Sequence, residues 1–224
     1  LFLVKNLKVP KWAQGLMPMM IVPLLSTLII GLLMFFVIGL PIVWATEALT
    51  EFLEGLQGSG KFFFGSIVGG MAAFDFGGPV NKVASLFADG LLLEGVQGPE
   101  AVKVLASMVP PFGVTISWVL SKIVRKRKYS KEEEDNIKIA FPMGLCMITE
   151  GVIPIAAVDP LRVIFSCTVG AAIGGGLSMS WGVGSPVPSG GVFIIPAMTD
   201  PLKFTLALLI GSAITGILLF VLKK

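Results

Sequence analysis

The sequence predicts an all-α polytopic membrane protein with about four transmembrane helices and two opposed re-entrant hairpins. Of its 224 residues, 54% are hydrophobic and 14% are charged, whereas a soluble domain is usually about a quarter charged. Long uncharged runs alternate with short charged segments, and two apolar segments are interrupted by glycine and proline. These features exclude an ordinary cytosolic domain, a disordered tail and a disulfide scaffold.

Four segments are long and apolar enough to cross a bilayer, which takes about 20 residues. They are expected at residues 12–46, 104–121, 163–183 and 204–222, and none of them contains a charged side chain. Residues 87–100 contain carboxylates but no lysine or arginine, and we expect them to form a loop.

Two further apolar segments are too broken to form continuous helices. The first, about residues 62–82, ends in Asp75-Phe-Gly-Gly-Pro-Val-Asn-Lys82, and the second, about residues 139–162, contains Thr149-Glu-Gly-Val-Ile-Pro154. Glycine and proline interrupt a helix, and irregular backbone at membrane depth is tolerated only where protein or water satisfies it. Each segment is therefore predicted to enter the bilayer and return to the same side.

Lysine and arginine are concentrated before the first predicted span, in residues 122–131 and at Lys223–Lys224. Such clusters mark the cytoplasmic side of a membrane protein. Four spans and two hairpins that enter from opposite faces place all of these clusters on one side. The segment 122–138 is therefore predicted to be a solvated cytoplasmic loop, and the C-terminus is predicted to lie on the same side.

The residue types that are missing exclude several chemistries. The sequence has no histidine, which removes an imidazole base, a Ser-His-Asp arrangement and a His-ligated zinc site. Cys146 and Cys167 lie in apolar runs and form no C-x-x-C pair, so we read them as buried apolar residues. No metal and no cofactor are expected, and the charge pattern lacks the basic stripe of a nucleic-acid-binding protein.

The two hairpins share a plan that indicates a binding site. Each has a carboxylate, Asp75 or Glu150, followed by a Gly/Pro break and a cation, Lys82 or Arg162. Paired interrupted segments are the best sequence indication of a transporter site. Glu150, with apolar residues on both sides, is predicted to be a buried carboxylate that contacts the ligand, with capping of a half-helix as the alternative.

The remaining polar residues of the hairpins fit supporting roles as well as ligand contact. Asp75 is expected mainly to cap or support the first hairpin, and Asp159 is expected to pair with Arg162. Asn81 and Lys82 fit hairpin scaffolding and ligand contact equally well. A sugar suits this set of groups, because a carboxylate and amides can bind its hydroxyls, and each carboxylate has a cation nearby that weakens an inorganic-cation site.

The motifs themselves resemble a known family. Residues 74–82 resemble the D-x-G-G-P-x-N-K element, and residues 148–163 the I-T-E-G-x-I-P-x-A-x-x-D-P-x-R-V element, of the fructose-type enzyme IIC permeases of the bacterial phosphoenolpyruvate-dependent phosphotransferase system. Met108–Pro111 and Pro188–Gly191 also occur in family order. The resemblance covers essentially the whole chain.

The resemblance implies a permease that binds a fructose-like sugar and carries it inward across the bacterial cytoplasmic (inner) membrane. A partner IIB domain carrying phosphocysteine, supplied by IIA and HPr, would phosphorylate the sugar, so the chain would be the membrane subunit of a protein-phosphohistidine–sugar phosphotransferase complex and would carry no phosphorylated residue. The family also implies a homodimer. Residues 1–224 are expected to be the C-terminal part of an enzyme IIC, without its N-terminal spans.

By position in the family motif, Glu150 is expected to hold sugar hydroxyls and is the candidate for activating one of them. The candidate sugar contacts are Glu150, Thr149, Asn81, Lys82, Ser189 and Gly190, and the candidate supporting residues are Asp75, Gly78, Pro79, Pro154, Asp159 and Arg162.

Ser189 departs from the family pattern, in which fructose members usually read P-H-G-G. Serine forms hydrogen bonds but is no acid or base near neutral pH, so the substrate range extends to a related hexose, polyol or glycoside. Two alternatives remain open from sequence: an ion-coupled secondary transporter of a sugar or organic anion, and a truncated, non-transporting permease remnant.

Overall fold

The computed structural model describes residues 15–33 and 58–223, together with residues 10, 36, 37, 44, 48, 51 and 55. The chain divides into two units, Leu1–Glu51 and Phe52–Lys224. In the first unit, the helical elements are the π-helix η2 (Met17–Ile21) and α2 (Val22–Leu33). Both fall within the predicted span 12–46, but much of that span lies outside the described residues, so its full extent stays a prediction.

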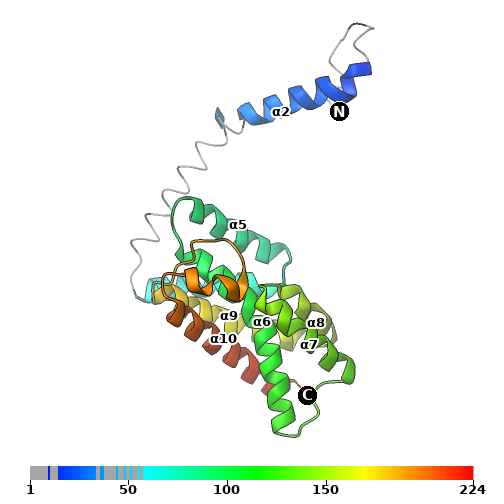
Figure 1. Ribbon diagram of the computed structural model, residues 1–224, viewed down its shortest axis with the longest axis vertical. Coiled ribbons are helices and arrows are strands. Elements are labelled where there is room, and N and C mark those ends of the chain that lie inside the picture. The colour runs from blue at the N-terminus through cyan, green and yellow to red at the C-terminus, as the bar shows by residue number, and fades with distance from the viewer. Residues whose placement is uncertain are drawn as a thin grey trace. The chain divides into compact units, whose positions relative to one another are not determined.

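The described part of the second unit consists of helices joined by loops and contains no strand (Figure 1). Its elements are α4 (Ser59–Phe74), α5 (Pro79–Leu93), α6 (Gly98–Ile123), α7 (Lys131–Leu145), the 3₁₀-helix η4 (Thr149–Val152), α8 (Ile153–Val158), α9 (Pro160–Ser180), the 3₁₀-helix η5 (Gly191–Ala197) and α10 (Pro201–Leu222). This confirms the all-α expectation.

Three of the described helices, α6, α9 and α10, are long and apolar enough to cross a membrane. They contain most or all of the predicted spans 104–121, 163–183 and 204–222, and they pack against one another (Figure 1). The number of spans in the whole chain and the re-entrant course of the two hairpins stay predictions.

Small residues bring α4 and α9 close together. A Cβ atom added at Gly65 would lie 2.5 Å from the carbonyl oxygen of Gly175, and one added at Gly69 would lie 2.5 Å from that of Ala171. Helices in membranes associate through such close backbone contacts. Gly175 and Ala171 of α9 therefore lie directly against the backbone of α4.

The predicted loop at residues 87–100 is wrong for most of its length. Helix α5 continues to Leu93, and α6 already begins at Gly98. Helix is possible here because the charges are paired: Lys103 forms ion pairs with Asp89 and Glu100. A carboxylate that has a partner in space does not require a solvated loop.

The basic loop is shorter than the predicted segment 122–138, because α7 begins at Lys131. A capping box starts this helix: Ser130 Oγ accepts from the Glu133 backbone N–H at 3.1 Å, and Glu133 Oε2 accepts from the Ser130 N–H at 2.8 Å. These bonds satisfy two backbone donors that a helix start otherwise leaves free.

Candidate functional site

The two hairpin tips and the loop before η5 meet around a cavity of about 300 Å³. Its lining comes from α5 and the turn before it, from α6, from the segment around η4 and from the loop. The lining residues are Gly77, Asn81, Lys82, Ser85, Asp89, Lys103, Ser107, Met147, Thr149, Glu150, Pro188 and Ser189. Three motifs that are far apart in the sequence thus contribute to one polar cavity, at the small end of the range for ligand sites.

The tip of the first hairpin is fixed by its own backbone. Asp75 accepts hydrogen bonds from the N–H groups of Val80 (2.7 Å) and Asn81 (3.0 Å), so its carboxylate caps α5. Pro79 occupies the first turn of α5, where its missing N–H costs nothing. Gly78, the residue before it, is packed against Asp75, because a Cβ there would lie 2.6 Å from Oδ2. These residues support the tip and do not line the cavity.

Glu150 differs from the expectation of a buried carboxylate, because its side chain is exposed. Its neighbours Thr149, Gly151 and Val152 are buried against α6 and α7, and the 3₁₀ turn therefore directs Glu150 to the open side. The carboxylate lies beside the first hairpin, since a Cβ on Gly77 would be 2.6 Å from Oε1. Among the described residues it has no hydrogen-bond or ion-pair partner, so its oxygens are available to a ligand.

Thr149 holds this turn against α6. Its buried hydroxyl donates to the Ser107 carbonyl oxygen at 2.9 Å. Pro111 lies four residues after Ser107 inside α6 and has no N–H, so that carbonyl lacks its usual helical donor. Pro111 therefore leaves the Ser107 carbonyl free to accept from Thr149, and this bond positions the turn that carries Glu150.

Replacing Thr149 with valine should lower the free energy of unfolding by about 1–3 kcal/mol, because the buried Ser107 carbonyl would lose its donor. Thr168→Val is the matched control, since the Thr168 hydroxyl is buried and has no partner among the described residues. The control should be neutral or slightly stabilising. Thermal unfolding of the detergent-purified variants measures both, and equal midpoints would contradict this role of Thr149.

Asn81 and Lys82 have different surroundings although they are adjacent. The buried Asn81 amide donates to the Ala72 carbonyl oxygen in α4, and its Oδ1 accepts from Ser85 at 3.3 Å. The bond to Ala72 joins α5 to α4, the two arms of the hairpin, whereas the bond from Ser85 lies within α5. Lys82 is exposed, lines the cavity and has no partner in the described part of the chain.

Other candidates lie away from the cavity lining. Gly190 follows Ser189 with φ of 138° and contacts Ile194, and Pro154 is exposed at the start of α8. Arg162 donates to Asp159 Oδ2 at 2.9 Å, which is the ion pair that the sequence indicates. This pair lines a separate cavity of about 620 Å³.

The ion pairs of Lys103 beside the cavity were not predicted from the sequence. Lys103 is buried, with Nζ 2.5 Å from Asp89 Oδ1 and 2.6 Å from Glu100 Oε1. The spacing of Glu100 and Lys103 was visible, because residues three apart share a helix face. Asp89 is 14 positions from Lys103, so the fold was needed to place it there.

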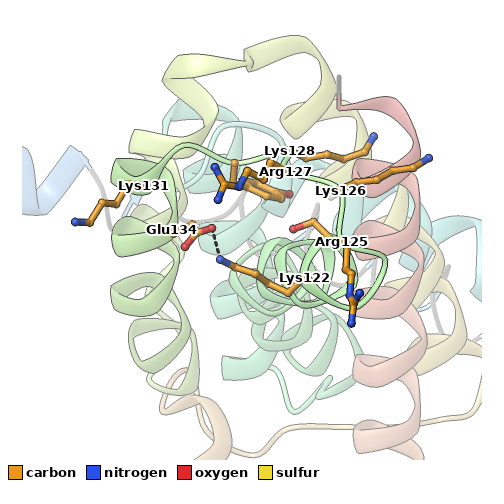
Figure 2. A pocket seen from close by; sticks show the side chains of 9 residues that line it. Lys122, Arg125, Lys126, Arg127, Lys128, Lys131 and Glu134 are labelled. Carbon is orange, nitrogen blue, oxygen red and sulfur yellow. Dashed lines mark ion pairs between the residues drawn. The ribbon is translucent and has the colours of Figure 1, made fainter.

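The basic loop encloses a cavity of its own, of about 500 Å³ (Figure 2). Its lining is dominated by the cations of residues 122–131. Lys122 pairs with Glu134 at 2.5 Å, and this hydrogen bond holds the pKa of the Glu134 carboxyl below its usual value.

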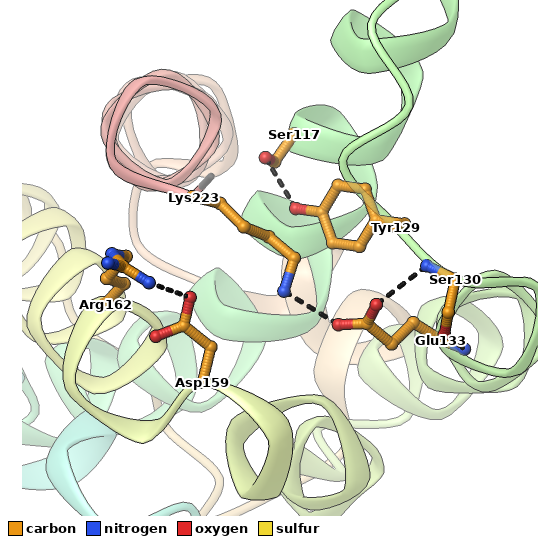
Figure 3. A network of polar contacts seen from close by, with 7 residues as sticks. All are labelled: Ser117, Tyr129, Ser130, Glu133, Asp159, Arg162 and Lys223. Atoms are coloured by element: carbon orange, nitrogen blue, oxygen red, sulfur yellow. Dashed lines mark hydrogen bonds and ion pairs between the residues drawn. The ribbon is translucent and has the colours of Figure 1, made fainter.

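A buried polar network fastens this loop to the end of α10 (Figure 3). Lys223 Nζ donates to Glu133 Oε1 at 2.7 Å and lies 5.0 Å from the Tyr129 ring centre. Tyr129 donates to Ser117 Oγ at 2.7 Å, and burial raises the pKa of its hydroxyl. The network links the first turn of α7, and through α7 the second hairpin, to α6 and α10.

Long apolar helices, closely packed through glycine, with a polar cavity between two interrupted segments, define a polytopic membrane protein with a ligand-sized site. The chain belongs to the fructose-type enzyme IIC permease family of the sugar phosphotransferase system. It is 38% identical over 216 residues to the fructose permease IIC component of Bacillus amyloliquefaciens, covering 96% of this chain and 69% of that protein.

Two other curated relatives are similar over nearly the whole chain. The fructose-specific EIIC component of Haloferax volcanii is 41% identical over 220 residues, which are 98% of this chain and 58% of that protein. The fructose-specific EIIB'BC component of Escherichia coli K12 is 40% identical over 222 residues, which are 98% of this chain and 39% of that protein. The chain thus spans less than two thirds of the length of these two. No family model matches the chain, and no solved structure matches it.

Proposed function

We propose that the chain is a membrane permease subunit that binds a neutral, fructose-like sugar in the cavity between the two hairpin tips. The sugar moves inward, and a partner IIB domain carrying phosphocysteine transfers its phosphoryl group to a sugar hydroxyl. The observation that carries the proposal is the convergence of three family motifs, through Asn81, Glu150 and Ser189, on one cavity. The names of the relatives support fructose or a close analogue.

The charges around the cavity also favour a neutral ligand. Lys82 and Lys103 contribute two positive groups, and Asp89 and Glu150 contribute two negative groups. A cavity lined by equal numbers of positive and negative side chains attracts neither an anion nor a cation strongly. The hydrogen-bond donors and acceptors of these side chains suit hydroxyl groups. Ser189 adds a hydroxyl that both donates and accepts. This balance argues against an organic anion as the substrate.

The partner's role follows from what this chain lacks and from its relatives. The sequence has no histidine, and the Escherichia coli relative combines B and C parts in its name. This chain's contribution to phosphoryl transfer is then to hold the acceptor hydroxyl in position, with Glu150 as the group that accepts its proton. IIA and HPr would supply the phosphoryl group to IIB.

The proposal places the chain in the bacterial cytoplasmic membrane with the basic loop and the C-terminus in the cytoplasm. The loop's cations at residues 122–131 support this orientation. The basic cavity would then face the compartment from which IIB approaches. A homodimer, as the family implies, is part of the proposal.

Proteoliposomes containing the full chain test the proposal directly. With phosphorylated IIB inside, external radiolabelled D-fructose should accumulate as sugar phosphate, and omission of IIB should abolish this. Uptake of unmodified sugar driven by a proton or sodium gradient would instead establish a secondary transporter. Failure to bind D-fructose, D-mannitol or D-glucose would indicate a non-transporting remnant and overturn the proposal.

A Gly77→Ala protein is expected to bind the sugar about tenfold more weakly, a loss equal to about 1.4 kcal/mol. The new Cβ would lie 2.6 Å from Glu150 Oε1 and would displace the carboxylate. Gly95→Ala is a matched control, because Gly95 also has a positive φ of 87° but has nothing within 4 Å of its Cβ position. Equal loss of sugar affinity in both variants would attribute the effect to backbone strain and contradict the contact with Glu150.

A further inference from the structure

The buried ion pairs of Lys103 form a second polar feature of the cavity, apart from Glu150. The Lys103 side chain is 5% exposed and the Glu100 side chain is fully buried, whereas the Asp89 side chain is 41% exposed. Lys103 and Asp89 line the cavity, and Glu100 does not. The cluster joins α5 of the first hairpin to α6.

Hydrogen-bonding capacity remains on the cavity side of this cluster. An ammonium group has three N–H donors and a carboxylate has two acceptor oxygens. Asp89 Oδ1 accepts a hydrogen bond from Lys103, and Glu100 Oε1, an ion-pair partner 2.6 Å from Nζ but outside hydrogen-bond geometry, occupies a second side of the ammonium group. Asp89 Oδ2 has no partner among the residues that the structure describes. One donor and one acceptor, held together by an ion pair, are therefore available to a ligand in the cavity.

Glu100 keeps the lysine in place. A lysine side chain is long and flexible, but two carboxylates hold the Lys103 ammonium at 2.5 Å and 2.6 Å. Glu100 makes this contact from one turn earlier on the same helix, away from the cavity lining. Binding groups that are fixed before the ligand arrives lose less freedom on binding.

We propose that Asp89 and Lys103 form a second recognition point for the sugar and bind two hydroxyl groups on neighbouring carbon atoms. Lys103 donates to one hydroxyl oxygen, and Asp89 accepts from the other hydroxyl. The inference rests on the proposed sugar-binding function and adds to it a determinant of which sugar is accepted.

This arrangement would favour sugars that carry both recognised hydroxyl groups over analogues that lack one of them. When a site built to hydrogen-bond a hydroxyl receives an analogue without it, the site's own polar groups are left unpaired. A deoxy sugar that lacks either member of the recognised pair would leave Asp89 Oδ2 or the third Lys103 donor without a partner. Ser189, neutral on the same cavity wall, cannot replace the charged donor.

The test combines Asp89→Asn with monodeoxy analogues of D-fructose, using equilibrium binding to the full chain in detergent. Asp89→Asn leaves the Lys103–Glu100 ion pair intact, so the buried charges stay paired. D-fructose should bind about tenfold or more weakly to this variant, as expected for loss of a hydrogen bond to a charged group. The analogue that lacks the hydroxyl bound by Asp89 should bind the variant and the unaltered protein equally.

Asp135→Asn is the matched control, because Asp135 forms a comparable ion pair with Lys138 at 2.7 Å on an exposed part of α7. It should leave the affinity for every sugar unchanged. The double variant Lys103→Gln/Glu100→Gln removes both buried charges together, and should lose the discrimination between D-fructose and the deoxy analogue that lacks the hydroxyl bound by Lys103.

The outcomes separate this inference from the proposed function. If the unaltered protein binds no sugar, the proposed function fails and the inference fails with it. If the unaltered protein binds D-fructose but Asp89→Asn reduces affinity for all analogues by the same factor, or for none, the recognition point is refuted and the permease function stands.

Discussion

Replacing Glu150 with glutamine is expected to weaken sugar binding by about 100-fold while leaving the fold intact. The exposed carboxylate lines the cavity and has no partner in the described residues, so its two oxygens can accept hydrogen bonds from sugar hydroxyls. Hydrogen bonds to a charged group contribute about 1.5–3 kcal/mol each. Glutamine keeps one acceptor, loses the charge and adds a donor.

Binding of radiolabelled D-fructose to the purified chain, together with its thermal midpoint, measures this effect. Glu94→Gln is the control, because Glu94 is also an exposed glutamate with no described partner and does not line the cavity. Both variants should unfold within about 0.5 kcal/mol of the unaltered protein, as is usual for exposed sites. Unchanged sugar binding together with unchanged IIB-dependent phosphorylation in Glu150→Gln would remove Glu150 from the site.

The same variant separates two roles for Glu150. If sugar binding survives but IIB-dependent phosphorylation is lost, Glu150 acts as the base for the acceptor hydroxyl. A general base contributes typically 10²–10⁴-fold to a rate, roughly 3–5 kcal/mol. Loss of binding and phosphorylation together indicates that Glu150 chiefly holds the sugar.

The largest stability effect is expected for Gly170→Ala in α9. The added Cβ would overlap the Thr215 hydroxyl and would lie 2.5 Å from the Gly211 carbonyl oxygen, both on α10. Because one of these neighbours is backbone, the two helices would have to separate. Overpacking a closely packed interior lowers the free energy of unfolding by about 1–3 kcal/mol and sometimes more. Because the added Cβ would meet backbone, we expect a loss at the upper end of this range.

Gly90→Ala is its control and should have the opposite sign. Gly90 lies inside α5 with nothing within 4 Å of its Cβ position, so alanine should stabilise the helix by about 0.5–1 kcal/mol. Unfolding in detergent with increasing denaturant measures both. An unfolding free energy of Gly170→Ala equal to that of the unaltered protein would contradict the close packing of α9 on α10.

The parts of the fold that could be predicted are those set by local sequence. The uncharged runs after Arg162 and Lys203 gave α9 and α10 because a bilayer-length apolar segment has few alternatives. The break at Asp75–Pro79 was equally local, since glycine and proline interrupt a helix. The capping box at Ser130 and Glu133 was also visible as S-x-x-E, and it would have placed the start of α7.

The features that could not be predicted depend on contacts across the fold. Asp89 was read as a loop residue, because its partner Lys103 is identified only once α5 packs on α6. Glu150 was expected to be buried because apolar residues flank it, but Thr149, Gly151 and Val152 take the buried side of the turn and Glu150 is exposed. The sequence therefore located the motifs that form the site, and the tertiary packing determined which side chains are free in it.

The central claim is that a sugar occupies the space between the hairpin tips, and protection of a cysteine in that space tests it most directly. Ser189 is exposed and lines the cavity, so Ser189→Cys should react with a soluble maleimide. Cys167 is fully buried as expected, whereas Cys146 is exposed, contrary to the expectation from sequence. Replacing Cys146 with serine therefore leaves only the buried Cys167 as a native thiol. Lys131→Cys in the same background is the control on the exposed start of α7.

Saturating D-fructose should slow alkylation of the Ser189→Cys protein about tenfold or more, because nine-tenths or more of the sites would be occupied. It should leave the Lys131→Cys rate unchanged. An alkylation rate at position 189 that does not respond to a sugar the protein binds would place the sugar elsewhere and contradict the account.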